Sequence, residues 1–185
     1  MDAISIFALV HQYSGAAEPA VNGLNLNIPK GAFYGLLGPN GAGKTTTISI
    51  ICGIVKPSSG TVSILGRDWK KDGTAIKNSI GLVPQEIALY DTMTANENLN
   101  FFGQMLGLNR KTIAKKADEL MDEFGLSEHK SKQLQHFSGG MKRRVNLMVA
   151  LLHDPEILIL DEPTVGIDVH SRHMINTYLK ALNEG

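Results

Sequence analysis

Hydrophobic and polar residues alternate along several short stretches of this chain. Near its start, Ile4, Ile6 and Ala8 are separated by single residues, and Leu24 and Leu26 repeat that spacing. A period of two is typical of a strand with one buried face, because successive side chains point to opposite sides. The predicted strands are 2–10, 20–28, 61–65 and 80–84, together with two short and largely apolar runs, 31–37 and 157–160.

Apolar residues spaced three and four positions apart predict helices elsewhere. The segment 86–137 is predicted to be helical, and Thr94 and Glu97 form the pattern of a capping box at a helix start. Further helices are predicted at 44–52, from Gly139-Gly140 to about residue 152, and from about residue 171 to 182. The predicted core positions of the helical segment are Leu99, Phe102, Met105 and Leu106, followed by Ile113, Ala117, Leu120, Met121 and Phe124.

Strands that alternate with helices around this insertion indicate an α/β core with a largely parallel sheet. The length of 185 residues fits one domain, at roughly 100–200 residues per domain. Acidic and basic residues balance at 18 each, which argues against a global basic field for nucleic acid or an anionic membrane. No apolar run reaches the ~18 residues of a membrane span, and the first residues lack the pattern of a secretory signal. We therefore expect an intracellular protein, in which the single Cys52 is a small buried side chain.

A glycine-rich motif lies between the predicted strand 31–37 and the predicted helix 44–52. It fits the phosphate-loop pattern G-x-x-x-x-G-K-[ST], in the strand-loop-helix context that this motif requires. Glycines let main-chain N–H groups wrap phosphates, and the helix N-terminus adds positive potential. Lys44 is predicted to reach the β- and γ-phosphates, and the Thr45 hydroxyl to complete a Mg²⁺ shell. The motif consists of Gly38, Pro39, Asn40, Gly41, Ala42, Gly43, Lys44 and Thr45.

Two carboxylates, Asp161 and Glu162, follow the predicted buried strand 157–160. Carboxylates at the end of a buried strand are costly unless a cation or a hydrogen-bonding substrate meets them. Asp161 suits a Mg²⁺ shell, and Glu162 is the candidate general base that polarises the attacking water. The patterns by which GTPases read guanine are missing, so ATP is the predicted nucleotide.

The segment Phe137-Ser138-Gly139-Gly140-Met141 adds a second motif that suits an anion, because a serine and two glycines open a helix. Together with the phosphate loop and the acidic pair at this spacing, it makes the chain resemble the nucleotide-binding subunit of ATP-binding cassette (ABC) transporters over nearly its whole length. The resemblance implies one ABC-type domain over 1–185. Its expected fold is a P-loop NTPase core with N-terminal antiparallel β strands and an inserted helical subdomain at about 86–137.

The same resemblance implies roles for other residues. Gln85 matches the glutamine loop, which senses Mg²⁺ and the γ-phosphate and couples to the membrane partner. Tyr13 is placed like the aromatic residue that stacks on adenine, Thr46 extends the phosphate cradle, and Asp168 resembles the loop that communicates across a dimer. In the implied head-to-tail dimer, Ser138, Gly139 and Gly140 of one subunit close over ATP held at 38–46 of the other.

Met141, the basic triplet 142–144 and the pattern Thr94-x-x-Glu97 resemble the cassettes of multidrug, antibiotic or lipid-type exporters. The implied function is an ATPase that powers transport, with export as the expected direction, by a membrane permease subunit. Homodimers and heterodimers both remain open, no nucleic-acid partner is expected, and the expected location is the cytoplasmic face of the membrane. From its composition alone, the basic triplet is expected to be a solvated helix face.

The chain stops at 183–185, where the resemblance implies another apolar strand and a histidine that contacts the γ-phosphate. The six histidines are interpreted as structural or exposed. We therefore expect either a chain that is incomplete at this end or a sheet that closes in an unusual way. A non-catalytic nucleotide-binding or regulatory module that lacks this histidine is therefore the alternative. Cassettes that act on DNA or ribosomes are a further one, although residues 86–137 show no sustained heptads and the chain holds only one cassette.

Overall fold

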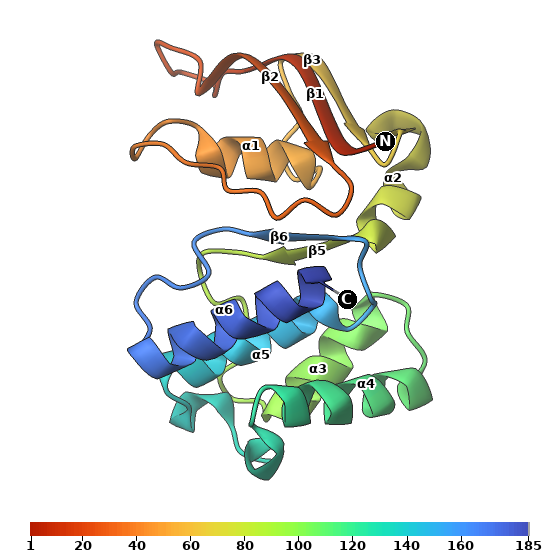
Figure 1. Cartoon of the computed structure of the whole chain (residues 1–185), viewed down its shortest axis with the longest axis vertical. Helices are drawn as coiled ribbons and strands as arrows, with labels where there is room; N and C mark the ends of the chain where they lie inside the picture. The colour runs from red at the N-terminus through yellow and green to blue at the C-terminus, as the bar shows by residue number, and fades with distance from the viewer. Residues whose placement is uncertain (185) are drawn as a thin grey trace. The chain divides into compact units, whose positions relative to one another are not determined.

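A computed structural model describes residues 1–184, with the side chain of residue 184 not described; residue 185, the last position of the predicted chain end, lies outside the described residues. The chain folds as two compact units, Met1–Ile80 and the residues from 81 onward (Figure 1). Each unit is described by itself below.

The first unit is built on an antiparallel sheet in the order β2-β1-β3-β4. Ile4 and Ile6 are buried in it, and Ile6 pairs with Leu26 on one side and Val62 on the other. The predicted alternation holds as far as Ile6 and is wrong beyond it, because Ala8 has a φ of +45° at an irregularity of the pairing, and Leu9 is buried in its place. The strands are β1 (Asp2–His11), β2 (Val21–Pro29), β3 (Ser59–Ile64) and β4 (Arg67–Asp68).

Two helices complete the first unit, α1 (Lys44–Ile51) and α2 (Trp69–Ser79). The first matches the predicted helix 44–52, whereas the second has no counterpart among the predictions. Asp68 caps α2 by accepting a hydrogen bond from the main-chain N–H of Lys70 at 2.8 Å.

The strand predicted at 31–37 is wrong. Residues 32–40 have no regular secondary structure, and Phe33, Tyr34 and Leu37 are exposed. A strand requires ladder hydrogen bonds to a neighbour, and within residues 1–184 no strand pairs with this segment. Its apolar composition alone does not produce a strand.

The second unit contains a two-stranded sheet, β5 and β6, and its helices lie on one side of this sheet (Figure 1). Figure 1 shows α5 and α6 lying side by side next to this sheet. The predicted strands 80–84 and 157–160 are confirmed. The elements are β5 (Ile80–Val83), α3 (Ala95–Met105), α4 (Arg110–Glu123), η1 (Ser127–His129), η2 (Leu134–His136), α5 (Gly139–Leu151), β6 (Ile157–Leu160) and α6 (Val169–Glu184).

The core of the second unit joins α3, α4, η2, α5 and α6. The apolar stripe predicted on α4 is buried from Ile113 through Phe124, and the capping box of Thr94 and Glu97 at the start of α3 is present. The stripe predicted on α3 is partly wrong. Leu99 is fully buried, but Met105 is 70% exposed, because α3 ends there and its last residue does not reach the core.

The basic triplet is not the solvated face that its composition indicates. On α5, Arg143 is 4% and Arg144 is 8% exposed, and only Lys142 reaches the surface of the helix. The residues before and after them on the same side, Gly140 and Leu147, are also buried. Positions i, i+3, i+4 and i+7 share one helix face, so both arginines lie on the face that packs inward.

Candidate functional site

The phosphate loop takes a conformation that depends on glycine. Gly41 and Gly43 have φ values of +82° and +81°, in the left-handed region that glycine enters without steric cost. Gly43 is also the residue that precedes α1, and a Cβ there would meet the carbonyl oxygen of Ala20. The loop between β1 and β2 ends so close to Gly43 that a side chain would not fit there.

Lys44 is held by the loop that it follows. Its Nζ donates hydrogen bonds to the main-chain carbonyls of Gly38 at 2.8 Å and Pro39 at 2.9 Å. Thr45 is exposed beside it, and the first turn of α1 contains no acidic residue. The start of α1 therefore presents an ammonium group, a hydroxyl and unpaired N–H groups, a combination that suits an anion.

Tyr13 lies beside this cradle in the same unit. Its phenolic oxygen is 3.2 Å from Oγ1 of Thr46, and its ring meets the His11 ring edge to face with centroids 4.6 Å apart. The Tyr13 side chain is 47% exposed, so one part of the ring is packed and another is open to a ligand. The structure thus brings together Tyr13 and Thr46, which are far apart in the sequence.

The acidic pair follows β6 in the second unit. Asp161 is 6% exposed, and its main-chain N–H donates to the carbonyl of Val83 at 2.9 Å, which continues the pairing of β6 with β5. Glu162 has a φ of +48°, a conformation that is strained for a residue with a side chain. Ala8, Leu65 and Asp154 share this conformation outside the candidate site, so the strain at Glu162 is a local feature of the turn after β6 and does not by itself mark a functional residue.

The serine of the second motif caps α5. Ser138 Oγ accepts a hydrogen bond from the main-chain N–H of Met141 at 3.2 Å. Ser138 and Gly139 are both exposed, whereas Gly140 is buried. The first turn of α5 therefore faces outward on one side and packs inward on the other.

Gly140 packs against the start of α6. A Cβ on Gly140 would come within 2.6 Å of Oδ2 of Asp168 and would also meet the Ser171 hydroxyl. Asp168 accepts a hydrogen bond from the main-chain N–H of Ser171 at 2.8 Å, and this bond holds the pKa of the Asp168 carboxyl below its usual range. The structure thus joins Gly140 and Asp168, two residues that were predicted separately.

Gln85 follows β5, and its side chain is exposed. Its main-chain carbonyl accepts a hydrogen bond of 2.6 Å from the guanidinium of Arg143, a residue absent from the predicted site. The spacing of Gly140, Arg143 and Leu147 on one helix face is the sequence signal that could have placed Arg143 inside.

The candidate residues divide between the two units. The phosphate loop, Tyr13 and Thr46 belong to Met1–Ile80, whereas Gln85, Ser138–Gly140, Asp161, Glu162 and Asp168 belong to the second unit.

Comparison with known proteins decides the family. A family model described as ABC transporter matches residues 21–165, which is more than half of the chain. The chain belongs to the ABC transporter family. Among its relatives, the linearmycin resistance ATP-binding protein LnrL of Bacillus subtilis is 51% identical over 164 residues, covering 89% of this chain and 53% of LnrL.

A second relative and a solved structure extend the similarity to nearly the whole chain. The daunorubicin/doxorubicin resistance ATP-binding protein DrrA of Streptomyces peucetius is 37% identical over 180 residues, covering 97% of this chain and 54% of DrrA. A dimeric ATP-binding cassette in a post-hydrolysis state, bound to ADP and Pi, matches with a TM-score of 0.87 and 29% identity, covering 98% of this chain and 83% of that one. The predicted α/β P-loop NTPase fold is confirmed. This chain spans about half the length of LnrL and of DrrA.

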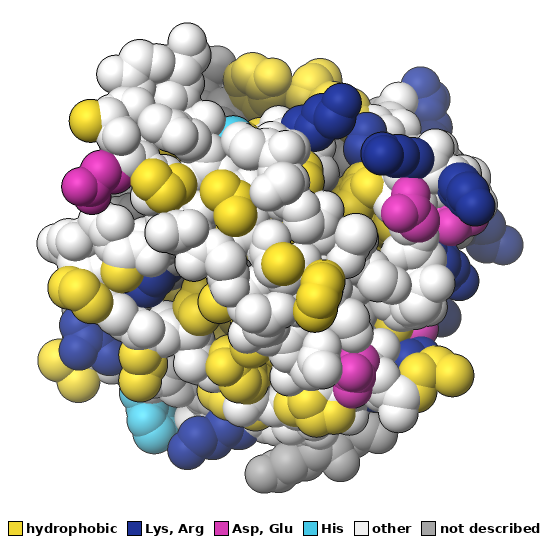
Figure 2. Space-filling view, turned by 90° about the horizontal axis from the view of Figure 1, so that it is seen from above, with side chains coloured by type: hydrophobic (Ala, Val, Ile, Leu, Met, Phe, Trp, Pro, Cys, Tyr) yellow, Lys and Arg dark blue, Asp and Glu magenta, His cyan; other side chains and the backbone are white. Residues whose placement is uncertain are grey.

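Two further properties of this ABC chain concern its surface and its helices. On the face shown in Figure 2, most Lys and Arg side chains lie towards the margins with Asp and Glu among them, and hydrophobic side chains are scattered between. Through residue 184, no helix combines the length and the apolar composition that crossing a membrane requires.

Proposed function

We propose that this chain is an ATP-binding subunit that binds and hydrolyses ATP and so powers transport by a membrane permease. The observation that carries the proposal is the cradle before α1. There the Lys44 ammonium is 2.8 Å from the Gly38 carbonyl, in a loop whose glycines adopt left-handed conformations. A loop of this kind exposes N–H groups and a mobile cation to the same ligand, which favours a polyphosphate.

In this proposal, the residues of the first unit bind the nucleotide. Lys44 exchanges its two carbonyl partners for phosphate oxygens, and the Tyr13 ring stacks on adenine. The hydrogen bond between Tyr13 and Thr46 supports this role, since it fixes the ring next to the cradle. The proposed ATP-binding residues are Tyr13, Gly38, Pro39, Asn40, Gly41, Ala42, Gly43, Lys44, Thr45, Thr46 and, across a dimer, Ser138, Gly139 and Gly140.

Mg²⁺ fits the oxygen donors that are present. Mg²⁺ usually binds one or two carboxylates together with substrate phosphates and waters, and Asp161 offers one carboxylate. Thr45, Gln85 and Asp161 are the residues that would hold it, and all three offer oxygen ligands. When bound, Mg²⁺ neutralises charge on the phosphates.

Hydrolysis is assigned to Glu162. Its carboxylate accepts the proton of the water that attacks the γ-phosphorus, while Lys44 stabilises the charge that develops on the phosphoryl oxygens. The place of Glu162 directly after the buried Asp161, at the end of β6, supports this role. Lys44 and Glu162 belong to different units, and their common role in this step is what the family resemblance implies.

The partners follow from the same proposal. Ser138 and Gly139 are exposed, so they are available to a second subunit, homologous or identical, and Asp168 would report on that contact. A permease would supply the membrane spans and hold the subunit at the cytoplasmic face of the membrane. Residues 1–185 would act as one ATP-binding domain, with about 86–137 as its helical subdomain. Export is the proposed direction, since two relatives bear the names of antibiotic-resistance ATP-binding proteins.

The substitution Glu162→Gln tests the proposal. Removing the general base while keeping the size of the side chain should leave ATP binding unchanged and lower the turnover of this chain by at least ~100-fold. ATP binding is measured by fluorescence titration and turnover by phosphate release. ATP-dependent dimerisation, measured by light scattering, should persist in the variant.

Glu128→Gln is the matched control, because Glu128 is an exposed carboxylate in η1 outside the candidate site. It should turn over ATP at the rate of the unsubstituted chain. Equal turnover in Glu162→Gln and the unsubstituted chain would contradict the role of Glu162. ATP binding without any turnover in the unsubstituted chain would favour the non-catalytic alternative instead.

A further inference from the structure

Arg143 is a buried cation whose described partners are main-chain carbonyls. Its Nη1 donates to the carbonyl of Pro84 at 2.8 Å, and its Nη2 donates to the carbonyl of Gln85 at 2.6 Å. The two bonds come from different nitrogens of one planar guanidinium, so they form a rigid fork across consecutive residues. The main chain at Gln85 is therefore held from α5.

This arrangement is expensive in free energy. Burial lowers the pKa of Arg143, and its Nε is buried with no hydrogen-bond partner among residues 1–184. An apolar side chain of similar size would fill the same volume without desolvating a charge. Stability alone therefore does not explain a guanidinium here, whereas fixing the main chain of Gln85 does.

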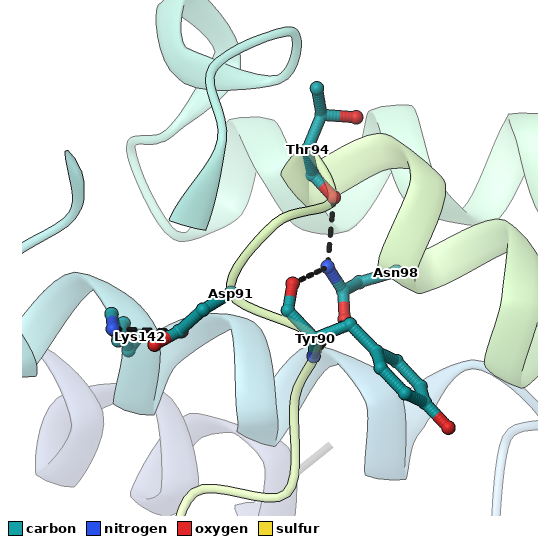
Figure 3. A network of polar contacts seen from close by, with 5 residues as sticks. All are labelled: Tyr90, Asp91, Thr94, Asn98 and Lys142. Carbon is teal, nitrogen blue, oxygen red and sulfur yellow. Dashed lines mark hydrogen bonds and ion pairs between the residues drawn. The ribbon is translucent and has the colours of Figure 1, made fainter. Parts of the chain in front are cut away.

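The other end of the same loop is also tied to α5 and to α3. Lys142 Nζ is 2.8 Å from Oδ1 of Asp91. Asn98 accepts a hydrogen bond from the main-chain N–H of Tyr90 and donates to the carbonyls of Tyr90 and Thr94, as Figure 3 shows for the two donated bonds. The loop from Gln85 to Asp91 is thus anchored at both ends, and consecutive residues of α5 supply an anchor at each end.

We propose that Arg143 is a positioning residue for Gln85, and that α5 links the Ser138-Gly139-Gly140 motif at its start to the glutamine loop. The inference rests on the proposed function for its catalytic consequence but not for its structural part. Arg143 lies one helical turn after the motif, so a displacement of the first turn of α5 also displaces Arg143. Its two hydrogen bonds then transmit that displacement to the main chain of Gln85. Arg143 acts through Gln85 and is not itself a catalytic residue.

Arg144 provides the matched control. It is the next residue on α5, it is 8% exposed, its Nε is also buried without a partner among the described residues, and its Nη1 donates to the carbonyl of Phe124 at 2.7 Å. Arg144 therefore shares the burial and the chemistry of Arg143 but holds the end of α4 instead of the glutamine loop. Any effect of removing a buried guanidinium as such is common to both.

The experiment compares Arg143→Lys with Arg144→Lys in the chain of 185 residues. Lysine keeps the charge but replaces the two nitrogens of the guanidinium with a single ammonium on a shorter side chain, so the two-nitrogen fork to the loop is lost. Without nucleotide, amide hydrogen exchange at residues 85–89 should become ~10-fold faster in Arg143→Lys, as expected from losing one charge-assisted bond, and should stay unchanged in Arg144→Lys. Equal exchange in all three proteins would overturn the positioning role.

The catalytic consequence has a separate readout. In Arg143→Lys, kcat should fall ~10-fold or more and the Mg²⁺ concentration for half-maximal rate should rise, while the ATP dissociation constant stays within about twofold. A purely structural defect would instead lower the folded fraction, and Arg144→Lys would share it. Equal kcat losses in the two variants would contradict the link to Gln85. If the unsubstituted chain shows no turnover, the proposed function fails, and the exchange measurement still decides whether Arg143 positions the loop.

Discussion

Lys44 and Arg143 both donate hydrogen bonds to two consecutive main-chain carbonyls, yet they do so in opposite surroundings. Lys44 is partly exposed, and it binds the carbonyls of its own loop at 2.8 and 2.9 Å. Arg143 is 4% exposed and binds the carbonyls of a loop 58 and 59 residues away in the sequence. The same kind of interaction therefore occurs once at a local, solvated site and once inside the second unit.

The difference lies in what each side chain can exchange. The ammonium of Lys44 is compact and lies at a partly exposed site where water can replace either carbonyl, so a phosphate can take their place at low cost. Removing Arg143 from its carbonyls instead leaves two partly buried acceptors without their partner and breaks a link between α5 and a distant loop, which costs up to about 1–3 kcal/mol for each bond. A solvated anchor suits ligand capture, and a buried anchor suits rigidity.

Lys44→Met should produce the largest functional effect, because it removes the exchangeable cation. We expect ATP affinity to fall by ~100-fold, since a hydrogen bond to a charged group contributes about 1.5–3 kcal/mol. The free energy of unfolding should change by less than ~0.5 kcal/mol, because the carbonyls of Gly38 and Pro39 can turn to water. ATP titration and urea unfolding measure the two quantities.

Lys56→Met is the control, as Lys56 is exposed in the same unit and lies outside the loop. It should alter neither quantity. A loss of stability in Lys44→Met comparable to that of a buried substitution would remove the distinction between the two regions.

Asn98→Ala tests the rigid region most strongly. Asn98 is fully buried and makes three hydrogen bonds to the main chain of Tyr90 and Thr94 (Figure 3). We expect the free energy of unfolding to fall by about 3 kcal/mol, because one buried donor and at least one acceptor lose their partner. Asn96→Ala, on the exposed face of α3, should change it by less than ~0.5 kcal/mol. The free energies of unfolding are compared from urea midpoints at constant m-value. Similar losses of stability in Asn98→Ala and Asn96→Ala would contradict a rigid loop.

Gly140→Ala and Gly139→Ala test the contact between α5 and α6. A Cβ at Gly140 would meet Ser171 and Asp168, whereas the nearest atom to a Cβ at Gly139 is the Gly166 carbonyl oxygen at 4.0 Å. Gly140→Ala should therefore lower the free energy of unfolding by about 2 kcal/mol through overpacking. Gly139→Ala should leave it equal or raise it by a few tenths of a kcal/mol, since alanine favours helices. Opposite signs in thermal unfolding are the expected result, and two equal losses would contradict the packing at Gly140.

The sequence predicts those parts of the fold that local patterns determine. The alternation around Ile4 and Ile6, the capping box of Thr94 and Glu97, and the glycines of the phosphate loop each require only neighbouring residues, and the structure contains all three. The division of the chain into domains and the roles of the site residues stay predictions.

Properties that depend on distant partners escape the sequence. Residues 31–37 are apolar enough for a strand but lack a paired neighbour within residues 1–184. The helical spacing of Arg143 with Gly140 and Leu147 could have indicated its burial, but its partners, the carbonyls of Pro84 and Gln85, lie too far away in the sequence for any local pattern to reveal them. The left-handed backbone of Glu162 also goes unpredicted, because only glycine announces such a conformation by its identity.

Lys142→Met gives the smallest expected effect. It tests a side chain whose exposure lies between that of the partly exposed Lys44 site and that of the buried Arg143. The Lys142 side chain is 19% exposed, and that of its partner Asp91 is 56% exposed, so solvent screens the pair more than it screens Arg143. We expect a loss of about 0.5 kcal/mol in the free energy of unfolding at low salt, and almost none at ~1 M salt, where the Debye length is about 3 Å. Lys115→Met is the control, because Lys115 is 77% exposed and 3.7 Å from Glu119, and its loss should be smaller still. A loss above ~2 kcal/mol that persists at high salt would group Lys142 with Arg143, and both ends of the glutamine loop would then be rigid anchors.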